Sequence, residues 1–179
     1  TTGSGNTIIG RSAGTNITTG AENVCIGLLA GHAGNSGRNV LIGHYTGFGL
    51  SNTNGYNIAI GYDAMQQCDS NPTHNICMGH SAGKYAGGDN SIFIGREAGK
   101  SASPVSSNSG NNNIGLGFYA LTQITSGHHN IGIGYYAGGK CGTNSSNVFI
   151  GQQAGREFSG SDYNIGIYCF LNLNTFFRA

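Results

Sequence analysis

The sequence has little charge, little proline and no tryptophan. Charged residues make up 8% of the 179 residues, proline occurs twice, and the formal net charge is +1. Surface helices of globular proteins are rich in charged and helix-forming residues, so this composition disfavours a helical fold. The chain also lacks a run of Lys or Arg that would attract nucleic acid, and we expect no nucleic-acid partner.

Long hydrophobic runs and paired ligand residues are missing as well. No apolar stretch reaches the roughly 18 residues of a membrane span, so we expect no membrane insertion. The five cysteines are odd in number and form no Cys-x-x-Cys pair, and we interpret them as buried or idle thiols. Histidines and acidic residues stand at no metal-ligand or catalytic spacing. We therefore expect no metal, no cofactor and no enzymatic activity.

Glycine is abundant, with 33 residues, and it marks a repeat. Each copy ends in a short apolar run followed by glycine, or by tyrosine in the tenth copy. Successive copies are 17, 16, 18, 18, 16, 22, 17, 17 and 17 residues apart. A short strand cannot bury an apolar face alone, so such copies must stack. The repeat predicts an all-β fold, a parallel β-solenoid of about ten coils with a period near 17 residues.

Two positions of each copy, three and one residues before the glycine, are aliphatic and mostly β-branched. Because they are spaced two apart, they share one face of an extended strand, and we expect that face to form the core. The position between them then points outward, yet it never carries a charge. An uncharged outward row favours packing between identical chains, and we expect a homotrimer. The large residues of this row are Ile8, Leu41, Phe93 and Phe149.

A column of asparagines lies four residues before the repeat glycine. We interpret it as a structural ladder of stacked amides that bond the coils above and below. The motif Gly-x-x-Ala-Gly follows the strand in six copies, and we expect its alanine to be buried inside a tight corner. The ladder residues are Asn6, Asn23, Asn39, Asn57, Asn75, Asn113, Asn130, Asn147 and Asn164, with Ser91 in the sixth copy.

Large side chains just after the repeat glycine predict an exposed edge. Tyrosine has an apolar ring and a hydrogen-bonding hydroxyl, so this edge could contact a host glycan or receptor. Packing between coils or chains is the alternative. The residues concerned are His44, Tyr45, Tyr62, His80, Phe118, Tyr119, Tyr135 and Tyr136.

The repeat sets the domain organisation. Residues 1–168 form the solenoid domain, and 169–179 are expected to be a cap or the start of a further segment. Most of the length variation falls between one corner and the next strand, which we expect to contain a second, less regular strand. The longest insertion, 100–112, is expected to form a surface loop.

The copies resemble the repeats of bacteriophage tail-fibre proteins and are similar to the head repeats of trimeric autotransporter adhesins. The resemblance covers about residues 5 to 168 and is carried by 57–64 (NIAIGYDA), 113–121 (NIGLGFYAL) and 130–138 (NIGIGYYAG). It implies a homotrimeric β-solenoid on an outer surface, acting as a shaft or an adhesin. The adhesin heads have shorter and more uniform coils, which favours the phage fibre.

The sequence thus predicts a structural fibre or adhesin segment on a virion or cell surface. It would be a tail-fibre shaft or a receptor-contacting region, with copies of itself as partners and a host-surface glycan or receptor as a possible further one. Two alternatives stay open. One is a filament subunit that joins end to end through the apolar C-terminal residues, and the other is a carbohydrate-processing fibre enzyme with paired acids in a groove.

Overall fold

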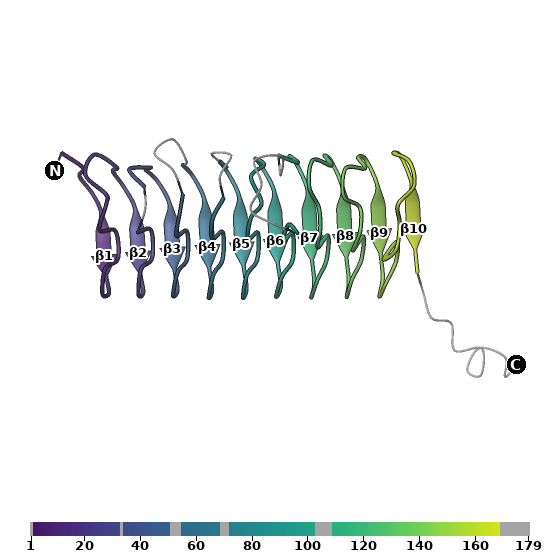
Figure 1. Cartoon of the computed structure of the whole chain (residues 1–179), viewed down its shortest axis with the longest axis horizontal. Helices are drawn as coiled ribbons and strands as arrows, with labels where there is room; N and C mark the ends of the chain where they lie inside the picture. Colours follow the sequence, from purple (N-terminus) through teal and green to yellow (C-terminus); the bar gives the residue numbers. More distant parts are fainter. Residues whose placement is uncertain (1, 33, 51–54, 69–71, 103–108, 169–179) are drawn as a thin grey trace, which may run out of the picture.

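The structure, a computed structural model, describes residues 2–32, 34–50, 55–68, 72–102 and 109–168. In this part the chain is a β-solenoid whose ten short strands form one parallel sheet in sequence order. The strands follow one another along a rod (Figure 1). They are β1 (Thr7–Ile9), β2 (Val24–Ile26), β3 (Val40–Ile42), β4 (Ile58–Ile60), β5 (Ile76–Met78), β6 (Ile92–Ile94), β7 (Ile114–Leu116), β8 (Ile131–Ile133), β9 (Val148–Ile150) and β10 (Ile165–Ile167). The predicted all-β parallel solenoid is confirmed.

The register of the sheet follows the repeat. Each residue of a strand pairs with the residue at the same position of the next copy, as Cys25 does with Leu41. The longest interval leaves this register intact, because Phe93 of β6 still pairs with Gly115 of β7. With about 4.8 Å between neighbouring strands, ten strands extend over roughly 43 Å. Length differences between copies are therefore absorbed outside the strands.

The strands face the opposite way from the sequence-based expectation. The middle residue of each strand points into the coil: Leu41 is 2% exposed, and Phe93 and Phe149 are 3% exposed. Ile8, at the open end of the sheet, is 42% exposed. The prediction that this row packs against neighbouring chains is wrong for Leu41, Phe93 and Phe149, because these side chains fill the core of their own chain. The side chain of Ile8 lies against Gly14 of its own coil, and it is exposed at the end of the sheet.

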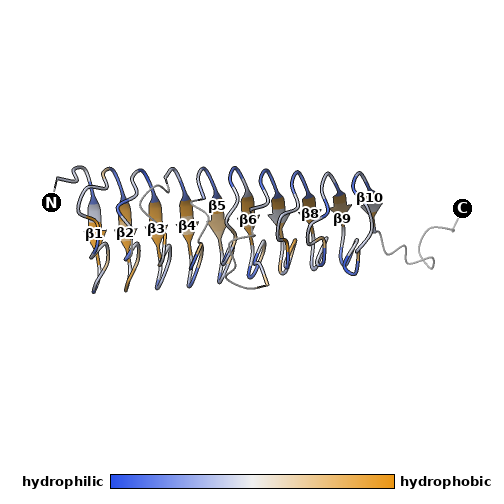
Figure 2. Ribbon diagram, turned by 45° about the horizontal axis from the view of Figure 1, so that its top comes forward, coloured by the Kyte–Doolittle hydropathy of each residue, from blue (hydrophilic) through white to orange (hydrophobic). Residues whose placement is uncertain are grey.

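The aliphatic rows on either side of the middle residue point outward. We call these two rows of the ten strands, one and three residues before the repeat position, the strand face. Every residue in them is partly or fully exposed, and most of the strands stand out as an apolar band in Figure 2. The members are Thr7, Val24, Val40, Ile58, Ile76, Ile92, Ile114, Ile131, Val148 and Ile165 in one row, and Ile9, Ile26, Ile42, Ile60, Met78, Ile94, Leu116, Ile133, Ile150 and Ile167 in the other.

Side-chain sizes in the core compensate within each coil. The middle strand residue faces the residue six positions later, and a large residue at one position goes with a small residue at the other. Phe93 lies against Gly99, where a Cβ atom would collide with the ring. Gly115 is followed by the fully buried Leu121, which also occupies the space beside Gly132. A narrow coil has room for one large side chain at this level, which explains why the middle row varies so widely.

The corner after each strand requires glycine on two grounds. Gly61 has a φ of 135°, which other residues rarely adopt, and a Cβ atom there would lie 2.6 Å from the carbonyl oxygen of Gly79 in the next coil. The alanine three residues after the glycine is buried in the corner, as predicted, and Thr46 takes its place in the third copy. The buried alanines are Ala13, Ala30, Ala64, Ala82, Ala98, Ala120, Ala137 and Ala154.

The asparagine column forms a continuous amide ladder. Asn147 donates from its backbone N–H and from Nδ2 to Oδ1 of Asn130, at 3.1 and 3.0 Å. Asn130 makes the same two bonds to Asn113, and its Nδ2 also donates to the carbonyl oxygen of Asn144. The amide of Asn130 therefore uses both Nδ2 donors and accepts twice, which satisfies a buried side chain completely. Ser91 continues the ladder as an acceptor for the N–H of Asn113.

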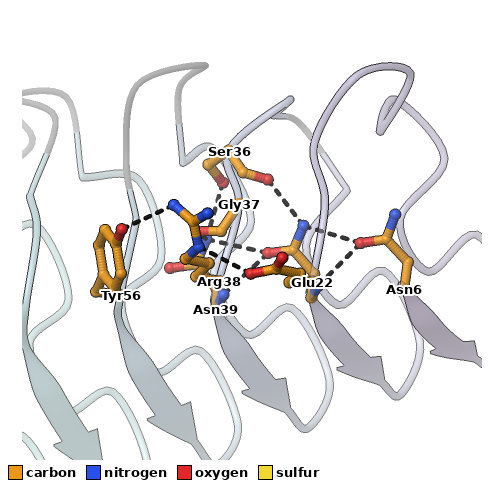
Figure 3. A network of polar contacts seen from close by, with 8 residues as sticks. Asn6, Glu22, Ser36, Gly37, Arg38, Asn39 and Tyr56 are labelled. Carbon is orange, nitrogen blue, oxygen red and sulfur yellow. Dashed lines mark hydrogen bonds and ion pairs between the residues drawn. The ribbon is translucent and has the colours of Figure 1, made fainter. Parts of the chain in front are cut away.

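Polar side chains outside the core also connect the coils. Figure 3 shows the N-terminal part of the ladder beside Arg38, which bonds Oε2 of Glu22 at 2.8 Å and the hydroxyl of Tyr56 at 2.7 Å. These three residues come from three successive coils. Exposed ion pairs contribute little stability, so we assign the main role in coil stacking to the buried ladder.

A second ladder runs two residues before the first one and was not foreseen. Here the backbone N–H of one coil donates to a side chain of the following coil, the reverse of the amide ladder. Asp89 N–H donates to Oδ1 of Asn111, Asn111 N–H to Nδ1 of His128, and Ser145 N–H to Oδ1 of Asp162, at 2.7 to 3.0 Å. The signal in the sequence is a hydrogen-bond acceptor at this position in copies five to ten.

The segment between each corner and the next strand contains no further strand in the described residues. The second, irregular strand expected there is therefore wrong. Turns and backbone bonds between neighbouring coils replace it, as from Gln123 N–H to the carbonyl oxygen of Lys100. Residues 103–108 of the predicted loop and 169–179 of the predicted cap lie outside the described part of the chain.

The ladder predicts the effect of removing one amide. Asn130→Ala removes the Oδ1 that accepts two bonds from the buried Asn147 and the Nδ2 that donates to Asn113 and to the carbonyl oxygen of Asn144, so we expect a loss of about 3 kcal/mol in the free energy of unfolding. Asn164→Ala, at the open end of the ladder, is the matched control and is expected to cost about 1 kcal/mol. Denaturant unfolding measures both. Equal effects of the two variants would contradict the ladder as the source of the stability.

Candidate functional site

The exposed edge beyond the strands is the richest collection of functional side chains. The second residue after the repeat glycine has a positive φ in all nine copies that have this glycine, between 54 and 60°. Tyr45, Tyr119 and Tyr136 occupy this position, and Tyr62 and Tyr135 stand at the position before it. The same backbone turn therefore places the first and second residues after the repeat glycine on one edge of the rod in every coil.

The structure brings the eight predicted contact residues together in two groups. In the first group, His44 lies 4.4 Å from Tyr45 and 5.1 Å from Tyr62 between ring centroids, and Tyr62 lies 5.2 Å from His80. The spacing of the coils and the spacing of stacked rings are close, so neighbouring coils can stack their aromatic side chains.

The second group is flanked by arginines. Phe118 and Tyr135 lie 5.5 Å apart, and Tyr119 stacks on Tyr136 at 4.6 Å. Arg96 lies over Phe118 at 4.7 Å, and Arg156 lies over Tyr136 at 4.6 Å. Tyr136 is thus covered by a ring from the coil before and a guanidinium from the coil after. Its hydroxyl and ring edge remain available to a ligand, whereas its two ring faces are used within the rod.

Two adjoining hollows open beside this second group. The first has a volume of about 270 Å³ and the second about 200 Å³. They share Thr122, Gln123 and Tyr136, so they adjoin, and we call the two hollows together the groove. Glu97 and Lys100 border its first half. The other half is bordered by Lys140, Arg156 and Glu157.

The charges around the groove are paired with one another. Lys100 Nζ lies 2.9 Å from Glu97 Oε2, and Arg156 Nε lies 3.4 Å from Glu157 Oε1. Lys140 also bonds Glu157. Burial raises the pKa of Glu97, but the hydrogen bonds and charges of Lys100, Tyr119 and Arg96 outweigh it and hold the pKa below its usual value. The bond from Lys140 lowers the pKa of Glu157 as well, so both groups are carboxylates at neutral pH.

The thiols and the other titratable groups form no metal site in the part of the chain that the structure describes. Within the same residues, no helix has the length and apolar character needed to cross a membrane. Cys25, Cys77 and Cys141 are buried free thiols. Burial raises the pKa of Cys25 to about 11 and that of Cys141 to about 12. This matches the interpretation of these cysteines as small core residues.

Thiol reactivity tests the burial of the core cysteines. In a Cys169→Ser variant, we expect Cys25, Cys68, Cys77 and Cys141 to be silent toward a thiol-specific chromogenic reagent, because all four side chains are buried. Burial also raises the pKa of Cys25, Cys77 and Cys141, so these thiols form little thiolate near neutral pH. All four should react after denaturation. Rapid labelling of the native chain would contradict the position of the middle row and corners inside the coils.

The Glu97–Lys100 pair predicts a pH effect. The lowered pKa of Glu97 means that its contribution to stability is complete above the unfolded value, about 4.3, and is lost as the pH falls through the lower folded value. Glu97→Gln should therefore flatten the decline of the unfolding free energy between about pH 5 and 3. Glu22→Gln, in a pair whose side chains are more than half exposed, is the control and should change the profile little. Identical profiles for wild type and Glu97→Gln would refute this.

No family model, no curated protein and no solved structure matches this chain. The comparisons therefore leave the fold and the surface chemistry as the basis for a functional proposal.

Proposed function

We propose that the chain is a structural, non-catalytic segment of an outer-surface fibre, and that further copies of the same chain cover its strand face. The strand face is the single observation that carries the proposal. Its two rows contain twenty residues, and nineteen of them are aliphatic or methionine. Soluble monomers rarely leave an apolar patch of more than a few hundred Å² exposed without a function.

The dimensions of the face support a large contact. Ten strands spaced at about 4.8 Å, each three residues long with two of them on this face, give an apolar strip of roughly 43 by 10 Å, or about 400 Å² in projection. No charged side chain interrupts the strip. Such a strip resembles the apolar centre of an obligate interface, in which charged residues are depleted.

The repeat of the face favours a copy of the chain as its partner. Side chains along each row recur at the strand spacing, so a surface with the same rise can interdigitate over the whole length. A second stack of these coils has that rise, whereas an unrelated globular surface does not. Three copies around one axis is the arrangement that the resemblance to trimeric fibres implies, with the rod at a virion or cell surface.

The groove carboxylates support binding over cleavage. A glycosidase needs a carboxylic acid that keeps its proton near neutral pH. Glu97 and Glu157 both have lowered pKa values because their cationic neighbours stabilise the charged form. We therefore propose receptor contact through the edge and no carbohydrate cleavage. End-to-end joining through 169–179 concerns residues outside the described part of the chain and stays an alternative.

Solution mass tests self-association directly. Light scattering coupled to size exclusion should give three times the chain mass of 18.4 kDa. Ile133→Lys places a charge in the middle of the strand face and should reduce the mass to that of one chain while the circular dichroism stays that of a β-solenoid.

The matched control lies in the same coil. Tyr135 is 39% exposed and Ile133 is 37% exposed, but Tyr135 lies outside the strand. Tyr135→Lys should keep the oligomeric mass. A monomeric wild-type chain, or equal dissociation by both variants, would overturn the proposal.

A further inference from the structure

The groove and the strand face are formed by different residues. None of the groove's lining residues belongs to a strand, because they come from the corners and from the one to three residues after each corner. Covering the strand face with further copies therefore leaves the groove lining out of the interface core. Its lining residues follow β6, β7, β8 and β9 in the chain. The groove therefore runs along the rod for about 14 Å, which is three coil steps.

The residues common to both hollows of the groove are neutral and polar. Thr122, Gln123 and Tyr136 line both hollows and supply two hydroxyls and one amide, which can donate as well as accept hydrogen bonds. The backbone holds Gln123 in place, because its N–H donates to the carbonyl oxygen of Lys100 in the coil before. Such a set of hydroxyl and amide donors and acceptors matches a ligand that presents many hydroxyl groups.

Every charged group at the rim of the groove is bonded to a group of opposite charge, with three cations sharing two carboxylates. Glu97 is neutralised by Lys100, and Glu157 by Lys140 and Arg156. Arg156 is further engaged by the ring of Tyr136. A neutral ligand can accept from the cations and donate to the carboxylates without displacing these pairs, whereas an anionic ligand would compete with the two carboxylates for the same three cations.

We propose that the groove is a binding site for a short, uncharged oligosaccharide that lies along the rod axis. The hydroxyls of the sugar form hydrogen bonds with Gln123, Thr122 and Tyr136. Further sugar hydroxyls form hydrogen bonds with the paired charged groups at the rim. This inference rests on the proposed receptor contact of the fibre and names its ligand class. A peptide is disfavoured because the groove has no unpaired strand to extend and no deep apolar pocket for an anchor side chain.

The sequence contains a matched control for the key residue. Gln67 occupies the same slot of the fourth copy, also with a positive φ, 54° against 65° for Gln123, and it lines neither hollow. Asparagine tolerates this backbone conformation, so Gln→Asn shortens the side chain at both positions without adding strain. A difference between the two variants then reports the groove and not the fold.

The experiment uses the full chain in its assembled state. It is applied to an array of neutral and acidic glycans, and the best neutral oligosaccharide is then titrated by calorimetry. We expect Gln123→Asn to weaken binding about tenfold, the loss of roughly one hydrogen bond, and Gln67→Asn to leave it unchanged. Tyr136→Phe should weaken binding by a similar factor.

Four results would overturn the proposal. The chain binds no glycan, or it binds acidic glycans alone. The Gln123 and Gln67 variants bind the oligosaccharide with equal affinity, or the chain binds a deglycosylated protein and no free sugar. The two proposals fail separately. An oligomeric mass without glycan binding removes the groove assignment and keeps the fibre segment. Glycan binding by a monomeric chain removes the self-association and keeps the groove.

Discussion

The in-register amide ladder is the interaction on which the rest of the structure depends. Each interior asparagine needs a partner one coil before it and another one coil after it, and a shift of one residue would leave both donors and acceptor buried and unpaired. The ladder therefore fixes the register of the adjoining strand. Once the register is fixed, the glycine corners, the buried alanines and the two outward rows recur at the same places in every coil.

This constraint explains which features were predictable from sequence. The strands, their order and their register follow from a period that only stacked coils can satisfy, and the asparagine column marks the ladder. The direction of the strand face did not follow. Alternation shows that Ile131 and Ile133 share a face, but it does not say which face is inside. The choice of the regular β-branched rows as the core was wrong.

The size pairing inside the coil contains the missing information. Phe93 with Gly99 and Gly115 with Leu121 vary in opposite directions, which is expected of residues that share one confined space. The β-branched rows show no such compensation. Their uniformity fits the proposed contact between identical copies, because such a contact repeats the same side chain in every coil.

The aromatic edge was located by the sequence, but its packing was not. Stacking between coils and the arginines over Phe118 and Tyr136 depend on backbone angles that no motif announces. The groove likewise combines residues from four coils. Only the rise of the solenoid brings Glu97, Gln123 and Arg156 to the same groove. The sequence alone could therefore indicate the aromatic edge but not the residues that line the groove.

Cryo-electron microscopy of the assembled chain tests the central claim most directly. The account predicts that the β-branched rows of the strand face meet across the contact between copies, while Leu41, Phe93 and Phe149 stay inside their own coils. Rods whose strand face is open to solvent, or a contact built from the middle row, would contradict it.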